Sequence, residues 1–191
     1  MGEDVLDPCL VQALLDNLSE LREQEALHRA GVGRETAFQV RPDIRGDRIR
    51  WLSRSDPVQA RFLDQMEILR LALNRYLFLG LFEFEAHYAH YPEGAGYKRH
   101  FDSFRGAANR VISLVAYLNH DWQPEDEGEL VLYNKAGECV VETIAPHAGR
   151  LVLFLSEEIP HEVMPSRRDR FSIAGWFRIN ASVQGQIDPA R

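Results

Sequence analysis

Hydrophobic residues recur every three to four positions in two stretches of the first 80 residues, which is the period of an amphipathic helix. The first stretch opens at Asp7-Pro8, a pair that supplies an N-cap and a first helical turn, and is expected to run to about Arg29. The second opens at Ser55-Asp56-Pro57 and is expected to end at Gly80. The apolar stripes are Leu10, Leu14, Leu18 and Leu21 in the first helix, and Phe62, Met66, Leu69, Leu73 and Leu77 in the second.

From residue 81 onward the hydrophobic period becomes two, which indicates β-strands. Glycine, proline and acidic turns separate eight candidate strands, at residues 82–91, 97–102, 110–119, 129–133, 139–144, 151–155, 161–164 and 171–180. Eight short strands after two helices predict a mainly β fold, a double-stranded β-helix or jelly roll with the N-terminal helices packed on one sheet. Because no internal repeat interrupts the pattern, residues 1–191 are expected to form one domain, with helical support over about 5–80 and a β-barrel core over about 81–180.

Composition narrows the classes of partner. The net charge of −7 argues against nucleic acid, since phosphate binding relies on clustered Lys and Arg. No run of 18 apolar residues suggests a membrane span, and the acidic start lacks the basic region of a signal peptide. Cys9 and Cys139 are too few and too far apart for a disulfide framework, so we expect a cytoplasmic protein.

The tripeptide His100-Phe101-Asp102, together with His161, carries the residue types of a metal site. Two imidazoles and one carboxylate are the ligands of the facial triad, which holds non-haem Fe(II) and leaves positions open for substrate and dioxygen. His100 and Asp102 are two positions apart, so on a strand both side chains leave by the same face. On a helix that spacing would separate them, because neighbours on one helical face are three or four apart. The pattern therefore predicts an Fe(II) site.

Arg170, nine residues after His161, adds a candidate carboxylate-binding group to the predicted metal site. A guanidinium can hold a carboxylate with two parallel hydrogen bonds, which suits an iron site that draws its electrons from a 2-oxo acid. Strand alternation predicts that Arg170 and Trp176 point together into the barrel, where a buried arginine needs a carboxylate partner. By the same alternation, Tyr117 can offer its hydroxyl to that carboxylate.

Longer stretches around these residues carry a family resemblance. They read Tyr91-Pro92-Glu93-Gly94-Ala95-Gly96-Tyr97-Lys98-Arg99-His100-Phe101-Asp102, Tyr117-Leu118-Asn119-His120-Asp121-Trp122, Pro160-His161-Glu162-Val163 and Arg170-Phe171-Ser172-Ile173-Ala174-Gly175-Trp176-Phe177. Together they resemble the Fe(II)/2-oxoglutarate-dependent prolyl hydroxylases, in particular the oxygen-sensing enzymes that modify hypoxia-inducible factor and their bacterial relatives. Residues 43–52 resemble a segment that in those enzymes belongs to a mobile loop over the active site, so the resemblance covers about residues 40–180.

The resemblance implies hydroxylation of a prolyl residue in a protein substrate, with Fe(II), 2-oxoglutarate and O2 as cofactor and cosubstrates and ascorbate as a candidate reductant. The implied iron ligands are His100, Asp102 and His161, and Arg170 is the implied partner of the distal carboxylate of 2-oxoglutarate. Tyr117 and Tyr91 are assigned to cosubstrate binding, Tyr91, Tyr97 and Trp176 to the prolyl pocket, and Arg45 and Asp47 to the loop that meets the substrate. The implied partner is a protein that presents a proline, with a component of the translation apparatus as one candidate.

Other functions remain open on the sequence alone. A hydroxylase of a free amino acid or small metabolite could use the same scaffold, and a β-barrel that only binds could keep the triad without catalysis. A cupin-type metal enzyme would need more histidine ligands. The remaining candidates, His87, His90, His120 and His147, lack the spacing of such a set and are expected on the surface or beside a ligand.

Overall fold

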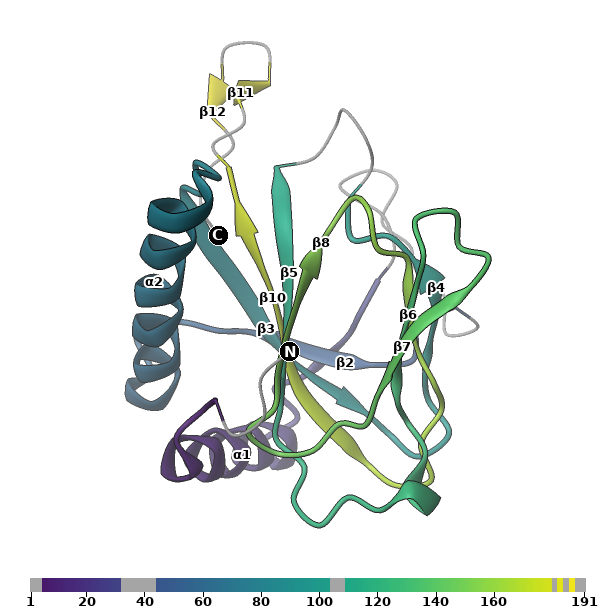
Figure 1. The fold of residues 1–191 in the computed structure, drawn as a ribbon. Helices are drawn as coiled ribbons and strands as arrows, with labels where there is room; N and C mark the ends of the chain where they lie inside the picture. The colour runs from purple at the N-terminus through teal and green to yellow at the C-terminus, as the bar shows by residue number, and fades with distance from the viewer. Residues whose placement is uncertain (1–4, 32–43, 104–108, 180–181, 184–185, 188–191) are drawn as a thin grey trace.

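The computed structural model describes residues 5–31, 44–103, 109–179, 182–183 and 186–187, and shows two helices and two facing antiparallel sheets (Figure 1). The helices are α1 (Pro8–Glu23) and α2 (Pro57–Leu77), and η2 (Pro124–Asp126) is a short 3-10 turn. In spatial order, the major sheet contains β1 (His28–Arg29), β2 (Arg48–Trp51), β3 (Glu83–Tyr91), β10 (Arg170–Arg178), β5 (Arg110–Tyr117) and β8 (Leu151–Leu155). The minor sheet contains β4 (Tyr97–His100), β9 (His161–Val163), β6 (Leu130–Tyr133) and β7 (Val140–Ile144), and β11 (Ser182–Val183) pairs with β12 (Gln186–Ile187).

The predicted architecture is confirmed. Each of the eight strands expected from the period of two is present, and the chain is mainly β with a jelly-roll arrangement of two antiparallel sheets. Both helices lie on the outer side of the major sheet, opposite the minor sheet (Figure 1). The ends of two expected segments, Asp43 and Asn180, lie outside the described residues.

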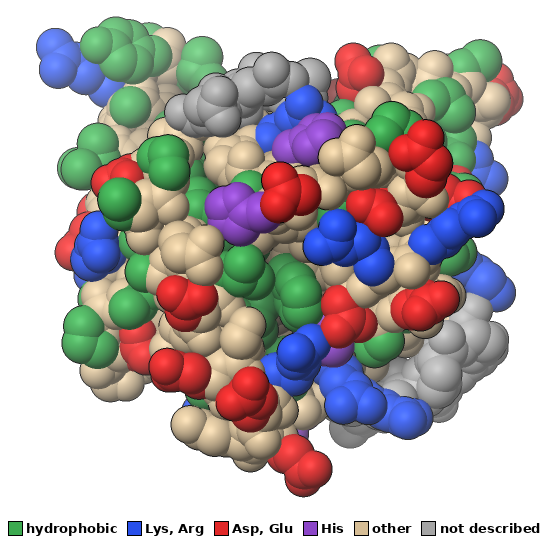
Figure 2. Space-filling view, turned by 90° about the horizontal axis from the view of Figure 1, so that it is seen from below, with side chains coloured by type: hydrophobic (Ala, Val, Ile, Leu, Met, Phe, Trp, Pro, Cys, Tyr) green, Lys and Arg blue, Asp and Glu red, His purple; other side chains and the backbone are tan. Residues whose placement is uncertain are grey.

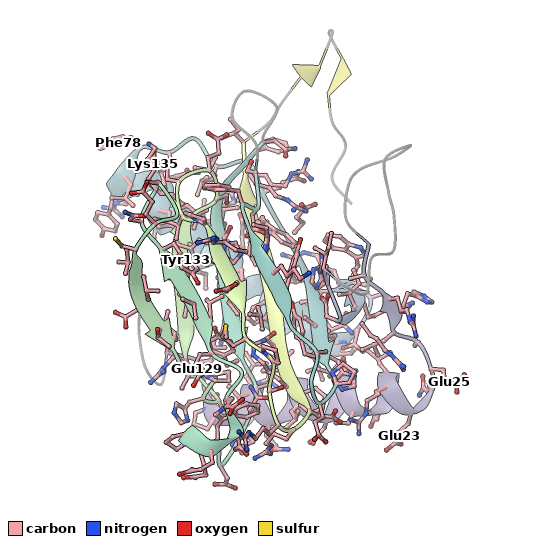
Figure 3. The ribbon with its side chains drawn as sticks, turned by 90° about the vertical axis from the view of Figure 1, so that its right-hand side faces the viewer. Glu23, Glu25, Phe78, Glu129, Tyr133 and Lys135 are labelled. Carbon is pink, nitrogen blue, oxygen red and sulfur yellow. The ribbon has the colours of Figure 1, made fainter. Side chains whose placement is uncertain are left out.

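Helix α1 is shorter than the hydrophobic period predicted, because it ends at Glu23 rather than near Arg29. Glu25 takes a left-handed conformation with φ of 55°, and its N–H donates to the Arg22 carbonyl. The N–H of Ala26 then reaches back to the Leu21 carbonyl at 2.9 Å, which completes a Schellman cap. The end of the helix is visible in Figure 3, where Glu23 and Glu25 are labelled. A glutamate in a position that usually holds glycine explains why the sequence did not predict this end.

The segment expected to form a loop over the active site is partly a strand. Arg48–Trp51 forms β2 and pairs with His87–His90 of β3, which makes it an integral part of the major sheet. Ile49 and Trp51 face the inside of the barrel, whereas Arg48 and Arg50 face outward. Four residues with two arginines are too short and too polar for a period of two to be recognised in the sequence.

Two hydrophobic cores share the central strands of the major sheet. Helix-facing residues such as Tyr88, Leu114 and Phe177 pack against the helices in the first core, and all three are fully buried. The alternate residues of the same strands, among them Tyr91 and Tyr117, belong to a second core between the sheets. The strand alternation predicted for β5 and β10 is therefore confirmed.

Gly175 leaves space for the ring of Phe84 in the first core. A Cβ atom at this position would lie 2.4 Å from the ring of Phe84, which packs with its centroid 4.6 Å from that of Phe177. Such an approach is far inside van der Waals contact, so only glycine leaves room for the Phe84 ring.

Acidic and basic side chains are interspersed over the face of the molecule that lies below α1 and the turn at η2 (Figure 2). In the part of the chain that the structure describes, no helix is long and apolar enough to cross a membrane.

Candidate active site

The three predicted metal ligands meet at one end of the minor sheet. His100, the last residue of β4, pairs with His161, the first residue of β9. The Nε2 atoms of His100 and His161 lie 3.6 Å from Oδ1 and Oδ2 of Asp102, respectively, and the ligand atoms of all three residues are within 4.8 Å of one another. In the described ranges this is the only group of three or more His, Cys, Asp or Glu side chains so placed. The arrangement fits the donor set of a facial triad.

Backbone carbonyls hold both imidazoles in the orientation that a metal requires. Nδ1 of His100 lies 2.8 Å from the Lys98 carbonyl, and Nδ1 of His161 lies 3.1 Å from the Ile159 carbonyl. A carbonyl only accepts, so each Nδ1 carries the hydrogen and each Nε2 presents a lone pair toward Asp102. Metal-binding histidines commonly use such a contact to fix the ring and its tautomer.

The electrostatics of the triad favour a neutral His161 and an ionised Asp102. Burial lowers the pKa of His161 to about 4, so its ring is neutral at pH 7. Burial alone would raise the pKa of Asp102, but His161, His100 and a hydrogen bond from Ser113 hold it well below its ordinary value. These are the protonation states in which His161 and Asp102 donate electron pairs to a cation.

Arg170 lies buried with one donor unused. Its side chain is 1% exposed, Nε donates to the Gly128 carbonyl at 2.9 Å and Nη1 contacts Ser172 Oγ at 3.3 Å. Nη2 is buried and has no hydrogen-bond partner among the described residues, and the same is true of the Tyr117 hydroxyl. Tyr91 and Tyr117 flank the guanidinium, with their ring centroids 5.2 and 5.1 Å from its central carbon. Burial raises the pKa of Tyr117 to about 12, so its hydroxyl remains a donor.

Unpaired buried donors of this kind are costly and indicate a missing acceptor. A carboxylate between Arg170 and Tyr117 would satisfy both, which is the arrangement predicted from strand alternation. The triad faces the same interior, because the Phe154 ring packs 4.6 Å from that of His161 and belongs to the same core as Tyr91 and Tyr117.

Arg45 and Asp47 lie beside the triad, on the segment that precedes β2. Arg45 forms an isolated bridge with Tyr97, and its guanidinium lies 4.9 Å from the centre of the Tyr97 ring. That ring in turn stacks on His100 with centroids 3.5 Å apart. Arg45 holds the buried carboxylate of Asp47 through contacts of 2.6 and 2.9 Å. Burial alone would lower the pKa of Arg45, but this pairing raises it above its ordinary value.

Trp176 adjoins an ionic cluster near the end of β10. The guanidinium of Arg110 lies 3.6 Å from the centre of the Trp176 ring and donates to Glu85 at 2.8 and 3.0 Å. Arg178 reaches Glu85 at 3.0 Å from the same face of β10. The indole Nε1 of Trp176 is buried and has no hydrogen-bond partner within the described residues. Sequence reasoning missed this cluster, although the even-numbered positions of β10 place Arg170, Trp176 and Arg178 on one face.

The expectation that the other histidines lie at the surface or beside a ligand is correct for His120 and His147, which are exposed. His87 and His90 are not at the surface, because β3 is covered on both faces and buries both rings. His90 stacks on Phe171 with centroids 5.0 Å apart, on the helix side of the sheet. The metal-like grouping therefore includes neither of them.

His87 should make the protein sensitive to acid. Burial between Trp51 and Trp176 lowers the pKa of His87 to about 4, whereas the pKa of a histidine in an unfolded chain is about 6.5. Between these values the unfolded state binds more protons than the folded state, so stability is lost as the pH falls from about 6.5 toward 4. We expect His87 to account for about 2 kcal/mol of lost unfolding free energy between pH 7 and pH 5.

Urea titrations of the metal-free protein at the two pH values measure this loss. His87→Phe should reduce it by about the stated amount, whereas His120→Phe, at an exposed site, should leave it unchanged. An equal loss in the parent and in His87→Phe would assign the acid sensitivity to other groups.

The chain matches known proteins over most of its length. The profile of the 2OG-Fe(II) oxygenase superfamily matches residues 86–178. The prolyl hydroxylase EGLN3 of Mus musculus is 30% identical over 185 residues, which cover 93% of this chain and 74% of that protein. The chain also matches Egl nine homolog 1 of rat, human and mouse, but it spans only 42%, 33% and 35% of their respective lengths.

Solved structures give the same result. The crystal structure of a Pseudomonas putida prolyl-4-hydroxylase superposes with a TM-score of 0.84 at 43% identity, and covers 93% of this chain and 90% of that one. A prolyl hydroxylase from Trichoplax adhaerens, solved with a peptide fragment of the oxygen degradation domain of hypoxia-inducible factor, superposes with a TM-score of 0.82 at 26% identity over 93% of this chain and 81% of that one. The resemblance to prolyl hydroxylases that the motifs predicted is confirmed.

Proposed function

This chain belongs to the 2OG-Fe(II) oxygenase superfamily, and on that basis we propose that it hydroxylates a prolyl residue in a protein substrate, with 2-oxoglutarate and dioxygen as cosubstrates. The observation that carries the proposal is the convergence of a metal-ligating triad and an arginine with an unused donor in one buried interior. The products are hydroxyproline, succinate and carbon dioxide. Ascorbate as a reductant remains a prediction.

In this proposal His100, Asp102 and His161 hold Fe(II), which when bound supplies the activation of dioxygen. The three side chains fit the ion because two imidazoles and one carboxylate converge, His100 and Asp102 from the end of β4 and His161 from β9. Their contribution would be to hold the ion at the interior that Arg170 and Tyr117 also face.

Arg170 and Tyr117 orient the cosubstrate. The Nη2 atom and the tyrosine hydroxyl donate to the distal carboxylate of 2-oxoglutarate, which satisfies two buried groups that otherwise lack an acceptor. Tyr91 packs against the guanidinium from the other side and excludes water from the ion pair. The dry surroundings strengthen the contact, because charges interact more strongly in a low dielectric.

Aromatic residues on either side of the triad provide the prolyl subsite. Tyr97 stacks on His100, and Trp176 lies on the inner face of the sheet opposite Ser113, which contacts Asp102. A proline ring packs well on flat aromatic faces. Arg45 and Asp47 place Tyr97 by stacking and pairing, so they act on the substrate through that ring. The Trichoplax relative was solved with a peptide, which favours an extended polypeptide as the occupant.

The test is transfer of oxygen to a protein. Cell lysate protein treated with the Fe(II)-loaded chain should gain the mass of one oxygen atom on a proline, as found by peptide mass spectrometry, and the oxygen should come from labelled dioxygen. Omission of 2-oxoglutarate should abolish the change. If free proline or another metabolite is hydroxylated faster than any protein, the small-molecule alternative replaces this proposal. A chain that never forms succinate would instead be a binding module.

Two finer expectations concern the location of the protein and the identity of its substrate. A cytoplasmic location is favoured by two cysteines that are both exposed and unpaired in the structure. The identity of the hydroxylated peptides decides whether the substrate comes from the translation apparatus.

A further inference from the structure

We propose that Ser113 and Ser156 form a hydrogen-bonded pair that positions the carboxylate of Asp102 for metal binding. The proposal rests on the proposed function in taking the triad as the Fe(II) site. It goes further because it assigns a role to two buried hydroxyl groups, on β5 and just after β8, that lie outside the ligand set.

Asp102 has less backbone support than the two histidines. His100 and His161 lie in paired strands, and a carbonyl contact fixes each ring. Asp102 lies two residues beyond the end of β4 and has no cross-strand partner in the part of the chain that the structure describes. Its side chain must therefore be oriented by contacts of its own.

Ser113 provides such a contact. Its Oγ lies 2.6 Å from Asp102 Oδ2, and the serine is only 1% exposed. Ser113 is rigidly placed, because it lies within β5 and pairs with Trp176 on β10 and with Phe154 on β8. The Ser113 hydroxyl donates this hydrogen bond, and the carboxylate oxygen of Asp102 accepts it.

This assignment fixes the role of the second serine. The Oγ atoms of Ser113 and Ser156 are 2.9 Å apart, and either could donate on geometry alone. Because Ser113 gives its single hydrogen to Asp102, the hydroxyl of Ser156 must donate to Ser113. Ser156 is itself completely buried, and its N–H donates to the Val111 carbonyl at 3.0 Å. The chain of donors runs in one direction, from Ser156 through Ser113 to Asp102.

The pair makes the two carboxylate oxygens unequal. Oδ2 carries the serine hydrogen bond, whereas Oδ1 faces His100 without one from Ser113. Ser113 therefore restrains rotation of the carboxylate and favours Oδ1 as the metal-ligating oxygen. Contacts that support a ligand in this way commonly change metal affinity by about 10-fold to 100-fold.

Binding of Co(II) to the metal-free full chain measures the effect without any substrate. Ser113→Ala should raise the Kd for Co(II) by about 10-fold or more and change the visible absorption of the bound ion, since the carboxylate loses its restraint. Ser156→Ala should also raise the Kd for Co(II), but by a smaller factor than Ser113→Ala. Ser113→Thr, which keeps the hydroxyl, should retain most of the affinity of the parent.

Ser166→Ala is the matched control, because this serine is equally buried but donates to the Arg168 carbonyl, away from the triad. It should leave the Kd for Co(II) unchanged. The proposal is overturned if Ser113→Ala binds Co(II) like the parent, if Ser113→Thr weakens binding as much as Ser113→Ala, or if Ser166→Ala has the same effect. A parent chain that binds no Co(II) and no Fe(II) would instead contradict the proposed function itself.

Discussion

Replacing His161 by alanine is expected to abolish iron binding and turnover together. The variant keeps only His100 and Asp102, so the facial site loses one of its three ligands. The loss should exceed about 100-fold in turnover, because even a group that only supports a ligand can cost that much. Iron content after anaerobic loading and succinate formation from 2-oxoglutarate measure the two effects. The fold should persist, because His161 lies outside the core that packs the helices on the major sheet.

His147→Ala serves as the control, since His147 is exposed and lies outside the triad. It should bind iron and turn over like the parent. Full activity of the His161→Ala protein would remove that residue from the metal site.

Replacing Arg170 by lysine should raise the 2-oxoglutarate requirement by on the order of 100-fold and leave iron affinity within a few-fold of the parent. An ammonium cannot reproduce the planar fork of a guanidinium, so Lys would lose the Gly128 contact or the cosubstrate contact. The measurement is the KM for 2-oxoglutarate in succinate formation, with Co(II) binding as the independent readout of the metal site.

Arg178→Lys is a matched control, because Arg178 is a buried arginine on the same face of the same strand. Its partners are Glu83 and Glu85, so it should leave the KM for 2-oxoglutarate nearly unchanged. If Arg178→Lys shifts the KM and Arg170→Lys does not, the carboxylate of the cosubstrate lies at the ionic cluster beside Trp176.

Local patterns predicted most of the fold, because strands and helices have distinct hydrophobic periods. The eight expected strands are present, and Asp56 caps α2 by accepting from the N–H groups of Val58 and Gln59. The errors occurred where local signals are weak. Glu25 ends α1 in a conformation that glycine usually adopts, and β2 is too short and charged to show its alternation.

The candidate site was predictable to the extent that residue type and strand alternation determine it. The sequence indicated the triad, Arg170 and Tyr117, and the structure brings each of them to the barrel interior. The pairing of Arg110 with Glu85 joins residues 25 positions apart, and the Ser113–Ser156 contact joins residues 43 apart. Such contacts depend on which strands become neighbours, and no short-range pattern encodes that order.

The alternation of the central strands places the packing of the helices on one face of the major sheet and the candidate active site on the other face. On β3, β5 and β10 the helix-facing residues form the first core, whereas their immediate neighbours in the chain face the triad, the buried arginine or the ionic cluster. Natural selection can therefore act on inner positions one at a time without disturbing the packing that holds the helices to the sheet. Substrate preference can change between descendants of one ancestor while the architecture stays the same.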